Sequence, residues 1–366
     1  MGSEKYKVVG IMSGTSLDGV DIVYCEFKFK ANKWSFDIIK ASTIPYNQEW
    51  INLLQNLETK DAFTIMQSDQ EFGFYLGELV KSFIDENDLD PDLISSHGHT
   101  IFHSVYETKI WRAGSEKRLT TQIGNGSAIS AICSLPVVCD FRSLDVALGG
   151  QGAPLVPIGD KKLFSGYDYC LNLGGFANVS YDLKDKRIAF DICPVNIVMN
   201  ELSKELGEDY DEGGKVAASG RINTNLFKGL NELTFYNTPP HQPKSLGKEW
   251  VVAFINPLLD IDNIALEDKM HTFSHHVSHQ ITKTLNELPK GNLLITGGGA
   301  YNSYLVDRLI LESHHRVTVP DKRLVDFKEG LIFGFLGVLR YRNENNCLSS
   351  VTGATRDNCG GAIYYP

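Results

Sequence analysis

The stretch Gly10-Ile-Met-Ser-Gly-Thr-Ser-Leu-Asp-Gly-Val-Asp21 connects two short apolar runs, residues 7–10 and 22–29. The second run is rich in β-branched and aromatic residues, so it predicts a strand. A P-loop or a dinucleotide fingerprint would instead need a helix to begin at the glycine turn. The stretch therefore predicts a hairpin, and any phosphate bound here would lie at a hairpin turn.

The turn carries residue types that suit phosphate binding. Glycines let backbone N–H groups approach a phosphate, two hydroxyls are available, and Asp18 or Asp21 could hold Mg2+ through water. The candidate nucleotide-binding residues of this turn are Gly14, Thr15, Ser16, Leu17, Asp18, Gly19, Val20 and Asp21. The same residue types are common in tight turns, so spacing alone leaves a plain hairpin turn as an equal alternative.

Two further glycine turns extend this pattern. Gly174 and Gly175 separate two expected strands about 160 residues after the first turn, and Gly297 and Gly298 join the strand 292–296 to a helix. Three such turns in this order predict two related α/β lobes with a nucleotide between them. We expect an N-terminal lobe of residues 1–140 and a C-terminal lobe of residues 141–366.

Hydrophobic periodicity and turn residues give the other expected elements. Helices are predicted over 66–87, 122–133, 197–206, 268–288, 303–311 and 329–342, and strands over 93–96, 137–139, 179–183 and 188–191.

Asp191 follows the apolar run 188–190 and precedes Ile192-Cys-Pro-Val-Asn196. A carboxylate at a strand end beside a glycine turn suits a general base, and it equally suits a cap of the following helix. Asp140 and Arg142 are also ambiguous, because they could orient a polar substrate or pair with each other. His97, in Ser96-His-Gly-His99, is expected to be a hydrogen-bonding residue at a strand end.

Histidines also recur at helical spacing, at His271, His275 and His279. Histidines four residues apart can share a zinc ion, but the glutamate of the HExxH motif is absent. We therefore expect a solvated helix face, and no metal bound by protein side chains alone.

Composition limits the classes of function. The 366 residues are 42% hydrophobic and 22% charged, which is typical of a folded globular protein. The formal net charge of −10 disfavours nucleic acid as a partner. Seven scattered cysteines without a CxxC pair argue against a disulfide framework. Without a legible secretory signal or a membrane-length apolar run, we expect a cytoplasmic protein with no membrane partner.

The motifs together resemble the anhydro-N-acetylmuramic acid kinase family. The resemblance spans residue 8 to the C-terminus and rests on segments in the family order: 10–21, 96–100, 140–142, 148–157, 171–175 and 350–354, with the lesser landmarks 122–124, 244–247, 297–299 and 329.

This resemblance implies an α/β fold of the two-lobed actin-like ATPase and sugar kinase type, with mixed sheets flanked by helices and an interlobe cleft for ATP. It implies a kinase that uses ATP and water to open the 1,6-anhydro bridge of 1,6-anhydro-N-acetylmuramate and to phosphorylate O6. The product is N-acetylmuramate 6-phosphate, in peptidoglycan recycling. Asp191 would activate the water, His97, Arg142 and Glu329 would contact the sugar, Mg2+ would accompany ATP, and the protein would be a homodimer.

One segment departs from the family pattern. Where the family usually has Asp-Thr-Gly-Pro-Gly-Asn, this chain has Asp191-Ile-Cys-Pro-Val-Asn196, and His99 replaces a common glutamine. The base is kept, but side-chain bulk is added at Cys193 and Val195. A kinase or ATPase of the same fold acting on another sugar is therefore the alternative, and a non-catalytic nucleotide or sugar sensor is a third hypothesis.

Overall fold

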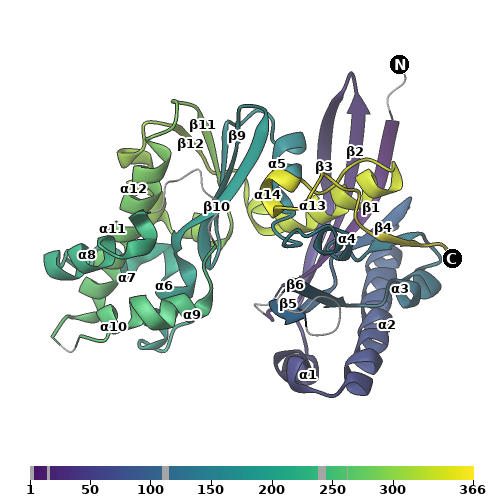
Figure 1. Cartoon of the computed structure of the whole chain (residues 1–366), viewed down its shortest axis with the longest axis horizontal. Coiled ribbons are helices and arrows are strands. Elements are labelled where there is room, and N and C mark those ends of the chain that lie inside the picture. Colours follow the sequence, from purple (N-terminus) through teal and green to yellow (C-terminus); the bar gives the residue numbers. More distant parts are fainter. Residues whose placement is uncertain (1–3, 15–16, 109–114, 238–244, 262) are drawn as a thin grey trace. The chain divides into compact units, whose positions relative to one another are not determined.

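A computed structural model describes residues 4–14, 17–108, 115–237, 245–261 and 263–366 (Figure 1). The chain forms two compact units. Unit 1 contains the residues up to Leu163 and those from Phe327 onward, and unit 2 contains Phe164–Asp326.

Unit 1 is built on a six-stranded mixed sheet with the order β13-β7-β4-β1-β2-β3. The strands β1, β2 and β3 are antiparallel, β4 and β7 run parallel to β1, and β13 is antiparallel to β7. The bounds are β1 Glu4–Ser13, β2 Val20–Lys30, β3 Lys33–Ile44, β4 Leu93–Ser96, β7 Val137–Cys139 and β13 Ala362–Tyr364. The hairpin predicted over residues 7–29 is therefore confirmed.

Alternation of side chains along β1 lets helices pack on both faces of this sheet. Val9 and Ile11 share a buried core with Phe72 of α2 (Ala62–Glu86). Gly10, between Val9 and Ile11, faces the other side of the sheet. It lies against α13 (Lys322–Tyr341), where an added Cβ would overlap the carbonyl oxygen of Gly330. Glycine is thus required at Gly10 by the close approach of a helix backbone.

The other elements of unit 1 are short, apart from one hairpin. A two-stranded sheet joins β5 (His99–Thr108) and β6 (Ser115–Ile123). The remaining helices are α1 Gln48–Asn56, η1 Leu57–Thr59, α3 Gly126–Cys133, α4 Ser143–Ala147, α5 Val156–Leu163 and α14 Ser349–Thr352.

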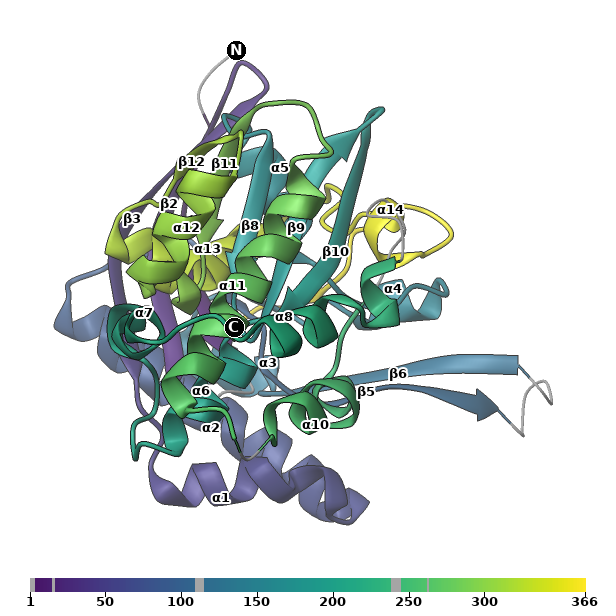
Figure 2. The same ribbon diagram turned by 90° about the vertical axis from the view of Figure 1, so that its left-hand side faces the viewer.

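Unit 2 repeats the central strand order of unit 1. Its five-stranded sheet has the order β10-β9-β8-β11-β12 (Figure 2), with β8, β9 and β10 antiparallel and β11 and β12 parallel to β8. The strands β3-β2-β1-β4-β7 of unit 1 have the same order and the same sequence of antiparallel and parallel pairings. The bounds are β8 Tyr169–Leu173, β9 Phe176–Leu183, β10 Lys186–Pro194, β11 Asn292–Thr296 and β12 Arg316–Thr318. The prediction of two related α/β lobes is confirmed.

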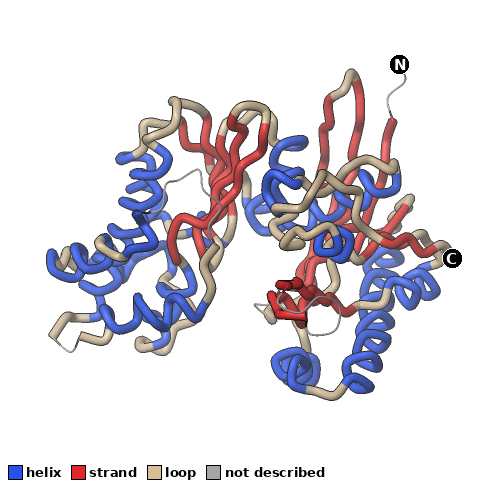
Figure 3. Tube along the Cα trace, in the orientation of Figure 1, coloured by secondary structure: helices blue, strands red, loops and turns tan. Residues whose placement is uncertain are grey.

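The helices of unit 2 gather on one side of its sheet (Figure 3), where they share one hydrophobic core with the strands. They are α6 Asn196–Lys204, η2 Glu212–Gly214, α7 Lys215–Ser219, α8 Thr224–Asn231, η3 Thr234–Asn237, α9 Lys248–Trp250, η4 Val251–Ile255, α10 Asn256–Leu259, α11 Leu266–Leu285, η5 Gly298–Tyr301 and α12 Ser303–Glu312. Within the described ranges, no helix combines the length and the apolar character of a membrane span.

The expected lobe boundary between residues 140 and 141 differs from the division of the structure. Strand β7 pairs with β4 and β13, and α5 packs near α13, where a Cβ at Gly159 would contact Ile332. Residues 141–163 therefore stay in unit 1, and the chain returns to it at Phe327. These long-range contacts leave no local signal in the sequence.

Two other expectations are corrected. The helix expected over 122–133 begins only at Gly126, because Gln122 and Ile123 close β6 and the Asn125 side chain caps α3 by accepting from Ser127 N. The strand expected to close at Asp191 continues to Pro194, with a bulge between Asp191 and Cys193.

Candidate active site

The first glycine turn connects β1 and β2 in unit 1, where Ser13 and Val20 form the last strand pair. Leu17 has a φ of 60°, and its N–H donates to the carbonyl of Gly14 at 3.4 Å. The Asp18 side chain is exposed, whereas Asp21 accepts a hydrogen bond from Thr43 Oγ1 at 2.5 Å. Thr15 and Ser16, two of the expected nucleotide-binding residues, lie outside the described residues.

A buried polar group underlies this turn. Ser13 Oγ lies 2.6 Å from the Tyr46 hydroxyl and 2.8 Å from His99 Nδ1. Burial lowers the pKa of His99 to about 4, so its ring is neutral at pH 7. The sequence pointed to His99 only as a departure from the family, and its bond to the turn depends on the pairing of distant segments.

His97 and Arg142 lie together in unit 1. Arg142 Nη2 and Nε donate to His97 Nε2 at 2.8 and 3.3 Å, and Arg142 Nη1 donates to the Gly152 carbonyl at 2.6 Å. Because a guanidinium only donates, His97 Nε2 accepts, and the ring proton resides on Nδ1, which donates to the Gly98 carbonyl at 2.8 Å. Burial and the Arg142 charge lower the pKa of His97 to about 3.

The pairing of Asp140 with Arg142, one of the two sequence interpretations, is replaced by these contacts. Asp140 Oδ1 instead accepts from Ser143 Oγ at 2.6 Å. Desolvation lowers the pKa of Arg142 to about 10, and the charge of Glu329 opposes that shift. Arg142 thus interacts with both other residues expected to contact the sugar, through hydrogen bonds to His97 and through its charge with Glu329.

Glu329 lies on α13 and is exposed. Desolvation raises the pKa of Glu329, while the charges of Lys328 and Arg142 act in the opposite direction. Lys328 Nζ in turn forms a buried ion pair with Asp160 Oδ1 at 2.7 Å. This pair could not be predicted from the sequence, because nothing in the local pattern relates two residues so far apart.

The other two glycine turns meet in unit 2. Strands β8 and β11 are parallel neighbours, so their carboxyl ends lie at the same edge of the sheet. A Cβ at Gly297 would lie 2.5 Å from Asn172 Oδ1, and the φ of Gly297 is 84°. Asn196 Nδ2 donates to the Leu173 carbonyl at 3.1 Å. The candidate residues Gly174, Gly175, Gly297 and Gly298 are therefore grouped at one sheet edge.

Asp191 lies on β10 of the same unit, opposite Asn178 of β9. Its Oδ2 accepts a hydrogen bond from the backbone N–H of Leu246 at 2.8 Å, and its side chain is half-buried. The cap interpretation is wrong, because α6 begins at Asn196 with Val195 at the N-cap. A carboxylate fixed by a backbone donor and open to solvent retains the geometry that a general base needs.

The side chains that depart from the family pattern at residues 192–195 point into the protein. Ile192, Cys193 and Val195 are at most 1% exposed and belong to the hydrophobic core of unit 2. The added bulk thus packs in the core beneath Asp191.

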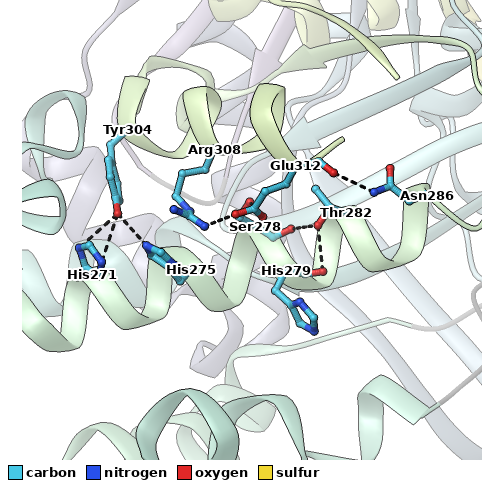
Figure 4. A network of polar contacts seen from close by, with 9 residues as sticks. All are labelled: His271, His275, Ser278, His279, Thr282, Asn286, Tyr304, Arg308 and Glu312. Atoms are coloured by element: carbon cyan, nitrogen blue, oxygen red, sulfur yellow. Dashed lines mark hydrogen bonds and ion pairs between the residues drawn. The ribbon is translucent and has the colours of Figure 1, made fainter. Parts of the chain in front are cut away.

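The histidine face on α11 is only partly solvated, because His271 and His275 are half-buried and lie against Tyr304 (Figure 4). His271 and His275 stack with ring centroids 4.4 Å apart, and His275 Nε2 lies 3.0 Å from the hydroxyl of Tyr304 on α12. His271 Nδ1 lies 2.7 Å from the carbonyl oxygen of Ala217. His279 is exposed, as expected. Among the described residues, no group of three or more histidine, cysteine, aspartate or glutamate side chains could hold a metal ion.

The duplicated strand order, with a glycine-rich hairpin turn in each unit, defines an α/β protein of the actin-like type, as the resemblance implies. The chain belongs to the anhydro-N-acetylmuramic acid kinase family, whose sequence model matches residues 6–366. The resemblance inferred from the motifs is thereby confirmed.

Similar proteins include two anhydro-N-acetylmuramic acid kinases. The protein from Pasteurella multocida is 32% identical over 375 residues, covering 97% of this chain and 96% of the relative. The protein from Photobacterium profundum is 31% identical over 388 residues, covering 100% and 99%. Among solved structures, the activator of the 2-hydroxyisocaproyl-CoA dehydratase from Clostridium difficile with bound ADPNP has 12% identity and a TM-score of 0.41, covering 92% of this chain and 97% of that chain.

Proposed function

We propose that this protein is an ATP-dependent kinase of 1,6-anhydro-N-acetylmuramate that opens the 1,6-anhydro bridge with water and phosphorylates O6, giving N-acetylmuramate 6-phosphate. The observation that carries the proposal is the family match over residues 6–366. Retention of Asp191, with its carboxylate held by Leu246 N, supports catalysis over a sensor role.

Asp191 is the general base in this proposal. It takes a proton from the water whose oxygen attacks C1, and the C1–O6 bond breaks. The released O6 bonds to the γ-phosphorus of ATP, and the bond from that phosphorus to the bridging oxygen breaks to release ADP. The two steps drive each other, because the leaving group of the first is the nucleophile of the second.

The sugar contacts are assigned to His97, Arg142 and Glu329. Arg142 is held by two partners, His97 and the Gly152 carbonyl, so little conformational entropy is lost when it meets a polar substrate. The raised pKa of Glu329 suits a carboxyl group that can share a proton with a sugar hydroxyl.

ATP binding is assigned to the turn of residues 14–21 and to the glycine pairs Gly174–Gly175 and Gly297–Gly298. Their backbone N–H groups suit phosphate oxygens. Mg2+ is assigned to Asp18, which offers an exposed carboxylate at the turn. Mg2+ usually keeps several waters and binds one or two carboxylates together with substrate phosphates. When bound, it supplies neutralisation of phosphate charge.

The test is ADP release coupled to 1,6-anhydro-N-acetylmuramate, with Asp191→Asn beside the wild type. The amide oxygen of asparagine can still accept from Leu246 N, so the fold is retained. We expect turnover to fall by about 10²- to 10⁴-fold. Asp185→Asn is the matched control, because Asp185 lies at the β9–β10 turn with a φ of 68°, which asparagine also tolerates.

Wild-type protein that releases no ADP with this sugar, but does so with another sugar from a panel, would replace the proposal by the alternative of a different substrate. Turnover retained in Asp191→Asn would remove Asp191 from the role of base.

Further properties belong to the same proposal. We expect a homodimer and a cytoplasmic location. We also expect no nucleic-acid or membrane partner, which is consistent with the net charge of −10. Light scattering after gel filtration tests the dimer.

A further inference from the structure

Asp145 on α4 is a carboxylate with no exposed surface, and the reaction proposed above does not use it. Its Oδ1 accepts from Cys347 Sγ at 3.0 Å, Thr352 Oγ1 at 2.8 Å and Asn358 Nδ2 at 2.9 Å, and its Oδ2 accepts from Gly152 N at 2.8 Å. These donors compensate the burial of the carboxylate. The two oxygens bind different segments: Oδ1 accepts from the C-terminal segment 347–358, and Oδ2 accepts from the glycine-rich loop 148–152.

The peptide of Gly152 links Asp145 to the sugar-contact residues. Its N–H donates to Asp145, and its carbonyl accepts from Arg142 Nη1 at 2.6 Å. The same guanidinium donates through Nε and Nη2 to His97 Nε2. Because the guanidinium is a rigid planar fork, fixing Nη1 also fixes the direction of the other two donors.

The C-terminal segment reinforces this loop. Gln151 N donates to the Thr352 carbonyl at 2.9 Å, and Thr355 N donates to the Leu148 carbonyl at 3.1 Å. Asp145 therefore lies where two backbone segments, 148–152 and 347–358, are joined.

We propose that Asp145 is the positioning residue of the His97–Arg142 pair, setting through Gly152 the orientation in which Arg142 meets the sugar. The role in sugar binding rests on the proposed function. An ionised carboxylate can accept all four donors at once. An asparagine cannot, because its NH2 group must face either Gly152 N–H or the donors grouped at Oδ1.

The experiment compares Asp145→Asn with the wild type by two readouts. The first is KM for the anhydro sugar and for ATP, and the second is the 15N signals of the His97 ring, which report the hydrogen bond at Nε2. We expect sugar KM to rise by about tenfold or more, ATP KM to stay within about twofold, and the His97 Nε2 signal to move. Unchanged sugar KM together with an unchanged His97 signal would overturn the proposal.

Asn346→Ala is the control for general loosening of the C-terminal segment. Its side chain bonds to the carbonyl oxygens of Leu336 and Gly360. We expect a lower melting temperature with wild-type sugar KM and a wild-type His97 signal. An equal rise of sugar KM in this variant would assign the effect to loosening and refute positioning.

Thr352→Val covers the case in which Asp145→Asn does not fold. It removes one Oδ1 donor at nearly constant volume, and we expect the same two changes at smaller size, about two- to threefold in sugar KM. Wild-type values of both readouts would count against the proposal. If the wild type shows no sugar-dependent turnover, the proposed function fails, and the His97 signals alone still decide whether Asp145 positions the pair.

Discussion

Units 1 and 2 share one strand order, but the sugar-contact candidates of unit 1 and the nucleotide-binding candidates of unit 2 use different chemical groups. In unit 1 the candidate sugar contacts are side chains, since Arg142 bridges His97 and Gly152 and the charge of Arg142 acts on Glu329. In unit 2 the candidate site is mostly backbone, with four glycines at the sheet edge, of which Gly175 and Gly298 are exposed, and with the carboxylate of Asp191.

The difference follows from what each group does in the proposed reaction. A sugar is recognised by directional polar groups, which are most selective when buried and held by their neighbours. A phosphate is recognised by closely approaching N–H groups, which a side chain would obstruct. Substitutions should therefore act differently in the two units.

Among the substitutions that test this difference between the units, Arg142→Lys should have the largest effect. Lysine cannot hold the His97 nitrogen and the Gly152 carbonyl with one rigid fork, so kcat/KM for the sugar should fall by about 100-fold, equivalent to about 2–3 kcal/mol. Steady-state kinetics with each substrate varied provides the measurement. Equal losses for sugar and ATP would break the comparison, because Arg142 would then serve both ligands.

Gly297→Ala and Gly298→Ala form a matched pair in unit 2. An alanine at Gly297 would adopt a φ of 84° with its Cβ against Asn172 Oδ1, so we expect a loss of about 1–3 kcal/mol in the free energy of unfolding. Gly298 is exposed and the nearest atom to its added Cβ, Asn196 Nδ2, lies 3.8 Å away, so its variant should lose less than about 0.5 kcal/mol.

The same pair separates folding from binding. Gly298→Ala should raise ATP KM several-fold while denaturant unfolding stays near wild type, because its methyl group would obstruct an approaching phosphate. Wild-type ATP KM in this variant would remove Gly298 from the nucleotide site.

Local sequence predicted the parts of the fold that local physics determines. The hairpins at Gly14 and Gly174 could be predicted, because apolar runs with β-branched or aromatic residues on both sides of a glycine turn favour strands. The unit boundary could not, because residues 141–163 stay in unit 1 through contacts with α13.

The candidate site could also be predicted only in part from the sequence. Residue types indicated the glycine turns and Asp191 as candidates, and the resemblance to the family added the sugar-contact candidates. The bond of His99 to Ser13 and the bonds of Asp145 arise only when distant segments meet, so no spacing in the chain indicates them. In the departure at 192–195, the sequence revealed the added bulk but not its direction, which the bulge after Asp191 sets.

Two buried histidines provide the smallest test of the comparison. Burial lowers the pKa of His99 in unit 1 to about 4 and that of His276 in unit 2 to about 3, from an ordinary value near 6.5. Between those values the unfolded state binds the proton and the folded state does not, so the unfolding free energy falls as pH falls below 6.5. The slope is at most about 1.4 kcal/mol per pH unit for each histidine.

His99→Gln and His276→Gln should each flatten the dependence of unfolding free energy on pH between 7 and 5, measured by denaturant titration. Only His99→Gln should also change ATP KM, by about two- to fivefold, because His99 holds Ser13 beside the turn of residues 14–21, whereas His276 bonds to Asn231 and Tyr236 in the helical core. A change of ATP KM in His276→Gln alone would reverse the assignment, since the buried polar groups of unit 2 would then support nucleotide binding and those of unit 1 would only stabilise the fold.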